Sequence, residues 1–403
     1  MPHKSLCFIL ATVFMTALAA SCGKGEDGAD TFVVSFLYPD GTWHTQTVFS
    51  GERATPPSPP TLQEGLYEGT IQHIGWFLGG AAVPFDFYAP ITADTTLQWE
   101  PSAAPIHMDS VSGHTTLDKA FAYVNRHPSA YTYIQTAAIT LEGELIDKRV
   151  LRASNTQLRI FSPYGHSISL SSKGRMFSVG AVALDNTISL TIDGAPLEGS
   201  HDNNDILVYM QNGGAFSSNS TISHNASSSG NGIAVYVASG GSFTLNQGGR
   251  IENNGNDLSG NPSGLFAADG GTTVRLAGGT IGNNRGWGGG VLVDDSIQSF
   301  SLSKEAKVDV LALRATAPNS RTPLTLEADW TGEVEKLHLW GSAYDLADVI
   351  HFWETGSPII IGAGTHVANI GRIGLGEFLT MDADKEAISA RYKIDGTGVL
   401  VPK

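Results

Sequence analysis

The sequence predicts an all-β protein in which short parallel strands stack in successive coils. The first observation is a repeat: Ile206–Met210 is matched 27 positions later by Ile233–Val237, both apolar apart from one tyrosine. The second is the content of 47 glycines, with Gly-Gly pairs after both segments, where chain reversals need positive φ or close stacking. A single coil of short strands cannot bury its apolar face, whereas stacked coils can, so the repeat favours a coiled architecture.

The N-terminus is typical of a secretory signal. Lys4 precedes an unbroken run of 15 apolar or small residues, Leu6 to Ala20, which is shorter than the ~20 residues that a membrane-spanning helix needs. The segment Leu18-Ala19-Ala20-Ser21-Cys22-Gly23 resembles the lipobox of bacterial lipoproteins, which implies cleavage before Cys22 and acylation of its sulfur. We therefore expect residues 1–21 to be a lipoprotein signal peptide and Cys22 to be the lipidation site. A plain secretory signal is the alternative.

Charge and cysteine content limit the partners and the location. Cys7 lies inside the signal, so Cys22 would be the one cysteine of the mature chain and could form no internal disulfide. Residues 22–30, rich in Gly and acid, predict a flexible tether. A net charge of −15 argues against nucleic-acid binding, which needs clustered Lys and Arg. We expect the protein at the bacterial outer membrane or cell surface, in contact with the membrane through its lipid anchor.

Residues 31–100 are predicted to form a small β module. Two β-rich runs, Phe32–Leu37 and Trp43–Phe49, flank the turn signal Pro39-Asp40-Gly41. Further along come Gly75-Trp76-Phe77, Phe85-Asp86-Phe87, Pro90-Ile91-Thr92, Asp94-Thr95-Thr96-Leu97 and Trp99. This order resembles the Listeria–Bacteroides repeat, or internalin B-repeat, which implies a small ubiquitin-like β fold that serves as a spacer or interaction module. We expect its aromatic residues to form a core rather than a sugar platform.

Residues 105–403 are predicted to form the coiled domain. Leu117, Ala120, Phe121 and Val124 have helical spacing, which predicts one helix over residues 116–127 that caps the first coil. Coil spacings of 27 to 30 residues lead us to expect about ten coils, a prism roughly 50 Å long. The pattern resembles the right-handed parallel β-helix of pectate-lyase-like proteins.

An asparagine recurs at one corner of the predicted coil. Asn225, Asn254 and Asn284 each follow an isoleucine by three residues. We expect them to form a stacked ladder in which each amide bonds the next coil, because Asn favours such turns. A metal-binding or glycan-binding role is the alternative.

Tyr209 and Tyr236 are the candidate ligand-binding residues. Strand alternation turns Val208 and Met210 toward the core and both tyrosines outward, with rings of neighbouring coils about 5 Å apart. Such a row could stack on sugar rings. Two alternatives stay open: the tyrosines only stabilise neighbouring coils, or a shifted register turns them inward.

The residues supply no complete catalytic or metal-binding set. Polygalacturonase-like β-helices combine Asp-Asp with Gly-His-Gly and Arg-Ile-Lys, whereas Asp294-Asp295 is present here without them. The oxygen-rich segment Asp202–Asp205 lacks the Gly and Glu of an EF-hand loop and is expected to be a solvated loop. We therefore expect no catalytic residue, no metal and no cofactor. The sequence favours a surface-anchored lipoprotein acting as an adhesin or a glycan- or host-protein-binding module; a β-helix polysaccharide lyase or hydrolase and a structural coat protein are the alternatives.

Overall fold

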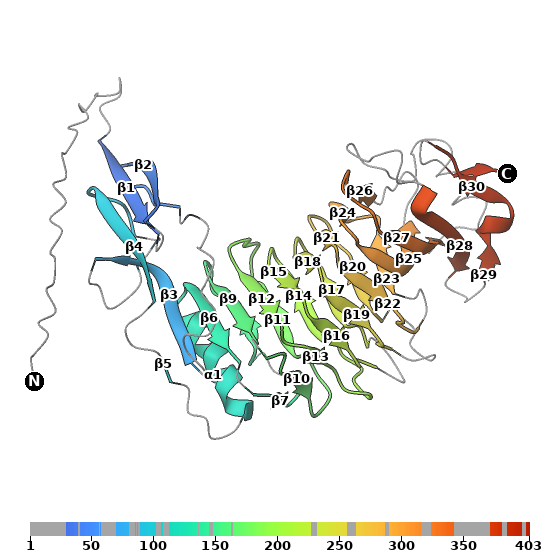
Figure 1. Ribbon diagram of the computed structural model, residues 1–403, viewed down its shortest axis with the longest axis horizontal. Coiled ribbons are helices and arrows are strands. Elements are labelled where there is room, and N and C mark those ends of the chain that lie inside the picture. The colour runs from blue at the N-terminus through green and yellow to red at the C-terminus, as the bar shows by residue number, and fades with distance from the viewer. Residues whose placement is uncertain are drawn as a thin grey trace, which may run out of the picture.

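The protein is seen in a computed structural model (Figure 1). Strands dominate the described residues, with one α-helix and short 3-10 segments at residues 371–372 and 388–390. The structure describes residues 30–38, 41–55, 57, 70–79, 85, 87, 89–101, 106–107, 113–135, 137–144, 148–162, 164–226, 232–255, 263–286, 290–315, 324–341, 371–380, 385–396 and 400–403.

Most strands form a parallel β-solenoid in which each coil contributes a strand to each of three stacks (Figure 1). The first stack contains β6 (Ala130–Ile134), β9 (Gln157–Phe161), β12 (Ser189–Asp193), β15 (Ala215–Ser218), β18 (Ser242–Asn246), β21 (Thr273–Ala277), β24 (Ser299–Ser303) and β26 (Leu324–Leu326). The second contains β7 (Ile139–Leu141), β10 (Ile168–Leu170), β13 (Leu197–Glu198), β16 (Thr221–Ser223), β19 (Arg250–Glu252) and β22 (Thr280–Gly282). The third contains β8 (Val150–Leu151), β11 (Phe177–Val179), β14 (Val208–Met210), β17 (Val235–Val237), β20 (Leu265–Ala267) and β23 (Val291–Asp294).

The last coils differ from the first. Strands β25 (Lys307–Ala315) and β27 (Glu333–Gly341) each run through the second and third stacks, so these two stacks merge into one 16-stranded sheet. The chain then forms β28 (Ile373–Thr380), β29 (Lys385–Ala387), the 3-10 helix η2 (Ile388–Ala390), β30 (Tyr392–Ile394) and β31 (Leu400–Pro402). The pairs β28–β29 and β30–β31 are antiparallel and end the coiled pattern.

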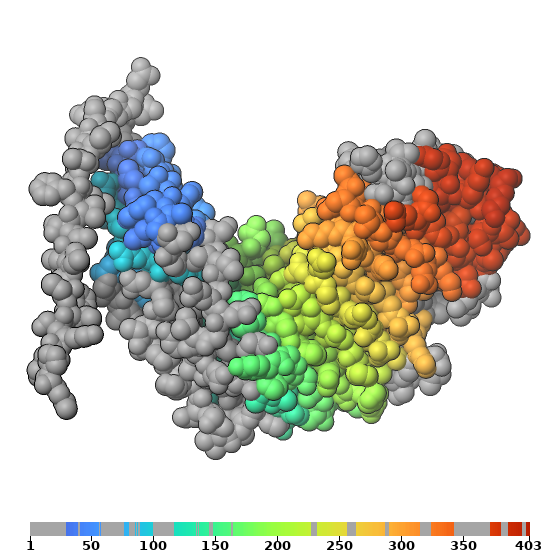
Figure 2. All heavy atoms as spheres, viewed as in Figure 1, coloured from blue at the N-terminus to red at the C-terminus, as the bar shows by residue number. Residues whose placement is uncertain are grey.

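The stacked-coil prediction is confirmed, but the number of coils was overestimated. The solenoid has about seven turns instead of ten. Coiling begins only at Ala130, after the helix, and it gives way to antiparallel pairs after β28, so part of 105–403 lies outside the coils. In the space-filling view the coils follow one another in chain order, from green to orange, along the long axis (Figure 2).

Helix α1 (Gly113–Arg126) caps the first coil, as its apolar spacing predicts. Leu117, Ala120, Phe121 and Val124 are all fully buried, and the Phe121 ring stacks on Phe177 of β11 with centroids 5.5 Å apart. The helix therefore covers the open end of the coil interior and shields it from edge pairing.

A buried arginine links helix α1 to the first coils. Arg149, 1% exposed, places Nη1 2.6 Å from Oδ1 of Asp118 on α1 and donates from Nε to the Met176 carbonyl at 2.9 Å. Its Nε also lies 3.6 Å from Oε1 of Glu144, whose side chain accepts the Arg149 backbone N–H. Burial raises the pKa of Glu144 to about 7, although Arg149 opposes that rise.

The asparagine ladder is confirmed and has one more member than predicted. Asn254 Oδ1 accepts the Asn225 N–H at 3.0 Å, and Asn284 Oδ1 accepts the Asn254 N–H at 3.1 Å. Asn203 adds a fourth rung by donating to Asn225 Oδ1 at 2.7 Å. Asn203 is fully buried, so the prediction of a solvated loop is wrong at this residue: its amide also bonds both backbone groups of Gly174 in the preceding coil.

The N-terminal module is a four-stranded sheet in the order β2-β1-β4-β3. Its strands are β1 (Thr31–Leu37), β2 (Trp43–Phe49), β3 (Thr70–Leu78) and β4 (Thr95–Pro101), with β5 (Ile106–His107) beside β3. Trp76 and Trp99 are buried and meet edge to face with centroids 5.2 Å apart, so these aromatics form a core as expected. Strand β3 also pairs with β6, which joins this sheet to the first solenoid stack.

Candidate functional site

Three aromatic side chains from consecutive coils stack on the outer face of the third stack. Tyr209, Tyr236 and Phe266 are the central residues of β14, β17 and β20 and lie opposite one another in the parallel register. The flanking residues Val208 and Met210 are fully buried, so alternation turns the aromatic rings away from the core, as the sequence predicts. We call Tyr209, Tyr236 and Phe266 the aromatic column.

The rings of the aromatic column contact each other mainly through their faces. Tyr209 and Tyr236 have centroids 5.4 Å apart at 36°, and Tyr236 and Phe266 are 4.9 Å apart at 7°. All three side chains are half-buried. Because neighbouring rings cover the faces, a ligand would meet the ring edges and the two phenol hydroxyls rather than an open aromatic platform.

Two arginines bracket the aromatic column. The guanidinium carbon of Arg175 lies 4.7 Å from the Tyr209 ring centroid, and that of Arg314 lies 5.4 Å from Phe266. Each cation is balanced by an acid: Arg175 Nε lies 3.4 Å from Oδ1 of Asp205, and Arg314 forms an ion pair with Asp294. The column thus offers guanidinium donors at both ends with little net local charge.

Their raised pKa values keep both tyrosines as hydrogen-bond donors. Burial raises the pKa of Tyr209 and of Tyr236 above the ordinary value, and nearby Asp269 adds to both rises. The hydroxyls therefore stay protonated at neutral pH. Burial also raises the pKa of Asp294, helped by a hydrogen bond to Asp295 and opposed by Arg314.

Beyond Phe266 the outer face becomes an apolar cluster. Leu292, the next residue in register, is 1% exposed and packs with Ala312, Trp340 and Leu379. Arg314 bridges the two regions, because its guanidinium carbon also lies 5.6 Å from the Trp340 ring.

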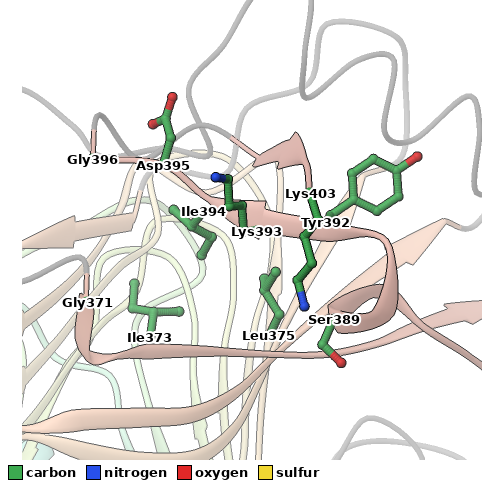
Figure 3. A pocket seen from close by; sticks show the side chains of 10 residues that line it. All are labelled: Gly371, Ile373, Leu375, Ser389, Tyr392, Lys393, Ile394, Asp395, Gly396 and Lys403. Atoms are coloured by element: carbon green, nitrogen blue, oxygen red, sulfur yellow. The ribbon is translucent and has the colours of Figure 1, made fainter.

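A separate groove of about 440 Å³ lies near the end of the chain. Ile373 and Leu375 of β28 and Ile394 of β30 line its floor, with Lys393 and Asp395 at the rim (Figure 3). These aliphatic side chains also pack against the main solenoid core. The groove therefore continues the core at its terminal end, and Ser389, Tyr392 and Lys403 also line it.

Sequence reasoning found part of this site. It placed Tyr209 and Tyr236 together, but it missed Phe266, whose segment Leu265–Ala267 repeats Val235–Val237 after 30 positions and could have been found by extending the repeat. Arg175 and Arg314 carry no such signal, because they reach the rings from different positions of their coils.

Cys22 lies outside the described residues. In the part of the chain that the structure describes, no group of three or more His, Cys, Asp or Glu is arranged to hold a metal ion. The described helices include none with the length and apolar character of a membrane span. Comparison with protein-family models, curated proteins and solved structures gives no match.

Proposed function

We propose that this chain is a lipid-anchored bacterial surface protein whose solenoid binds a neutral saccharide polymer along the aromatic column. The observation that carries the proposal is the half-buried column itself, bracketed by Arg175 and Arg314 on a parallel sheet. Coils repeat at the ~4.8 Å spacing of paired strands, so successive hydroxyls can meet successive units of an extended polymer. The ring edges and phenol oxygens of the aromatic column would contact this polymer.

A neutral polymer fits the charges better than an acidic one. Both arginines of the site are paired with aspartates, and the whole chain carries a net charge of −15. A polyanion would be repelled at long range and would have to displace Asp205 and Asp294 to reach the guanidinium groups. A neutral polymer pays neither cost.

The N-terminal parts would present this surface to the exterior. Lipid on Cys22 would hold the chain at the membrane, residues 22–30 would act as a tether, and a ubiquitin-like module over residues 31–100 would act as a spacer. The resemblance to internalin B-type repeats and the aromatic core of the β2-β1-β4-β3 sheet support this arrangement. A right-handed coil of the pectate-lyase type belongs to the same proposal.

The first prediction concerns the phenol hydroxyls. In the double variant Tyr209→Phe/Tyr236→Phe the ring stack is kept, but two hydrogen bonds to the ligand are lost, each contributing ~0.5–1.5 kcal/mol. We expect saccharide affinity on a glycan array to fall by roughly tenfold or more, while the melting temperature stays close to that of the wild type.

Tyr164→Phe is the matched control, because Tyr164 is 66% exposed and lies outside the column. A Tyr209→Ser/Tyr236→Ser variant removes the aromatic rings as well as the phenol hydroxyls. If its melting temperature falls while that of the Phe variant does not, the rings stabilise neighbouring coils in addition to any part in binding. If saccharide binding survives unchanged in both double variants, the aromatic column is not the binding site.

A second candidate function is cleavage of the bound polymer. Asp294 and Asp295 are hydrogen-bonded carboxyls beside Arg314, and burial raises the pKa of Asp294. Two hydrogen-bonded carboxyls are closer together than the ~6.5–9.5 Å that separates the catalytic pair of inverting hydrolases. Any saccharide that binds on the array should therefore be recovered at its original length; shortened products would favour the enzyme.

The second prediction concerns the anchor. Cells expressing the full chain and fed a palmitate analogue should label the protein, whereas Cys22→Ala should lose the label, because the lipobox-like run places the acylated sulfur at Cys22. Cys7→Ala is the control, since Cys7 lies within the predicted signal. A labelled Cys22→Ala protein would contradict the assignment.

A further inference from the structure

Strand β2 leaves one of its two edges without a strand partner in the described part of the chain. It stands at the end of the 13-stranded sheet and pairs only with β1 (Figure 1). The Ser50 N–H donates to the Asp30 carbonyl at 2.8 Å and the Tyr38 N–H to the Thr42 carbonyl at 2.9 Å. With this register, the even-numbered residues of β2 bond β1, and the odd-numbered residues direct their N–H and C=O groups to the free edge.

Among the described residues, this edge has none of the features that usually prevent edge-to-edge pairing. The strand Trp43–Phe49 (WHTQTVF) contains no Lys, Arg, Asp, Glu or Pro. Its outward side chains are exposed, with Trp43 at 50% and Phe49 at 54%, and they belong to the odd-numbered residues that hold the free backbone groups. Natural edge strands are normally protected by charge, proline, a bulge or a cover, so an unprotected edge of seven residues indicates a docking surface.

The strand is self-complementary about Gln46. In an antiparallel pair of two copies centred on Gln46, Trp43 lies opposite Phe49 and Thr45 opposite Thr47, and the same pairs recur by symmetry. The outward residues read aromatic, Thr, Thr, aromatic in either direction. All the odd-numbered residues then form hydrogen-bonded pairs, giving about eight backbone bonds. Aromatic and Thr–Thr cross-strand pairs are both favourable.

We propose that a second copy of this chain pairs with β2 in this antiparallel register, forming a two-fold symmetric dimer with a continuous sheet. The two-fold axis passes between the Gln46 residues, as closed C2 assembly requires. Thr55 does not occupy this edge with its backbone, because its N–H and carbonyl bond the Gln46 side chain.

The test uses the purified full chain in mild detergent and measures its mass by sedimentation at increasing concentration. The wild type should pass from monomer to dimer. Thr45→Pro removes an edge N–H twice in the symmetric dimer, and we expect at least a tenfold weaker association, because two backbone hydrogen bonds are lost. Thr45→Val keeps the N–H and should dimerise like the wild type.

Two further variants keep the proposal falsifiable if Thr45→Pro fails to fold. Trp43→Lys/Phe49→Lys changes only exposed side chains and replaces both aromatic pairs by Lys–Lys pairs, so it should remain monomeric at concentrations at which the wild type is dimeric. Gln46→Cys places the two thiols of the dimer on directly opposite residues, whose Cα atoms are about 4.5 Å apart, so this variant should form a disulfide-linked dimer on oxidation. Thr45→Cys should give no more cross-linked dimer than the wild type, because its two thiols are not opposite each other. A monomeric wild type, or a dimer that persists in the Lys variant, would overturn the proposal.

Discussion

Replacement of Arg149 by Met is expected to lower the free energy of unfolding by about 3–5 kcal/mol. The guanidinium bonds Asp118 on the cap helix, the Met176 carbonyl and the Glu142 carbonyl, and it lies beside Glu144. Without it, two carboxylates and two backbone carbonyls lose their partner at a site that is 1% exposed in the wild type. Methionine fills the space but supplies no donor, so the buried Glu144 and the partly exposed Asp118 both lose their compensating charge.

The free energy of unfolding that Arg149→Met loses should increase as the pH rises. Glu144 has a folded-state pKa of about 7 against 4.5 as its unperturbed value, so in the wild type its contribution to stability falls between about pH 4.5 and pH 7 and then levels off. Removing Arg149 raises that folded pKa further, and the fall continues above pH 7. The difference between variant and wild type should therefore be larger at pH 8 than at pH 5.

Denaturant unfolding followed by circular dichroism measures this difference, and hydrogen exchange of the α1 amides shows whether the cap opens first. Arg275→Met is the control, since Arg275 pairs with Glu327 at the surface with its side chain 50% exposed, where such pairs contribute little. Equal losses in the two variants, or a loss independent of pH, would contradict the role given to Arg149.

The features that could be predicted from the sequence are those that repeat. Helix α1 was found because its apolar residues recur at helical spacing, and the ladder because Asn225, Asn254 and Asn284 hold one position in coils of similar length. Asn203 occupies the same ladder but stands only 22 residues before Asn225, so its spacing falls outside the repeat.

Features that depend on contacts between distant residues could not be predicted in this way. The pairing of β3 with β6 joins segments about 60 residues apart, and no local sequence pattern predicts it. No local sequence pattern indicates that Arg149 is buried, because only the fold brings it between Asp118 and Glu144. At the candidate site, the half-buried state of the tyrosines follows from ring packing between coils, Tyr209 against Tyr236 and Tyr236 against Phe266, which alternation alone does not specify.

Replacement of Asn254 by Ala is expected to destabilise the middle of the solenoid by about 3 kcal/mol or more. Its Oδ1 accepts the buried Asn225 N–H, and its Nδ2 donates to the Ile222 carbonyl at 3.1 Å and to Asn284 Oδ1 at 2.9 Å. Alanine leaves the Asn225 N–H and the Ile222 carbonyl without these partners where water does not reach, since Asn225 and Ile222 are fully buried, whereas Asn284 Oδ1 keeps the backbone N–H of residue 254. Each buried group without a partner costs ~1–3 kcal/mol.

The neighbouring residue provides the control for this prediction. Asn253 is exposed and has φ of +57°, a conformation that glycine adopts without strain, so Asn253→Gly should leave the unfolding midpoint nearly unchanged. In the Asn254→Ala variant, hydrogen exchange should rise first in β16, β19 and β22, because the lost bonds connect these three coils and each coil depends on its neighbours. If the two variants unfold at the same denaturant concentration as the wild type, the ladder does not hold the coils together, and the apolar interior alone would account for their stacking.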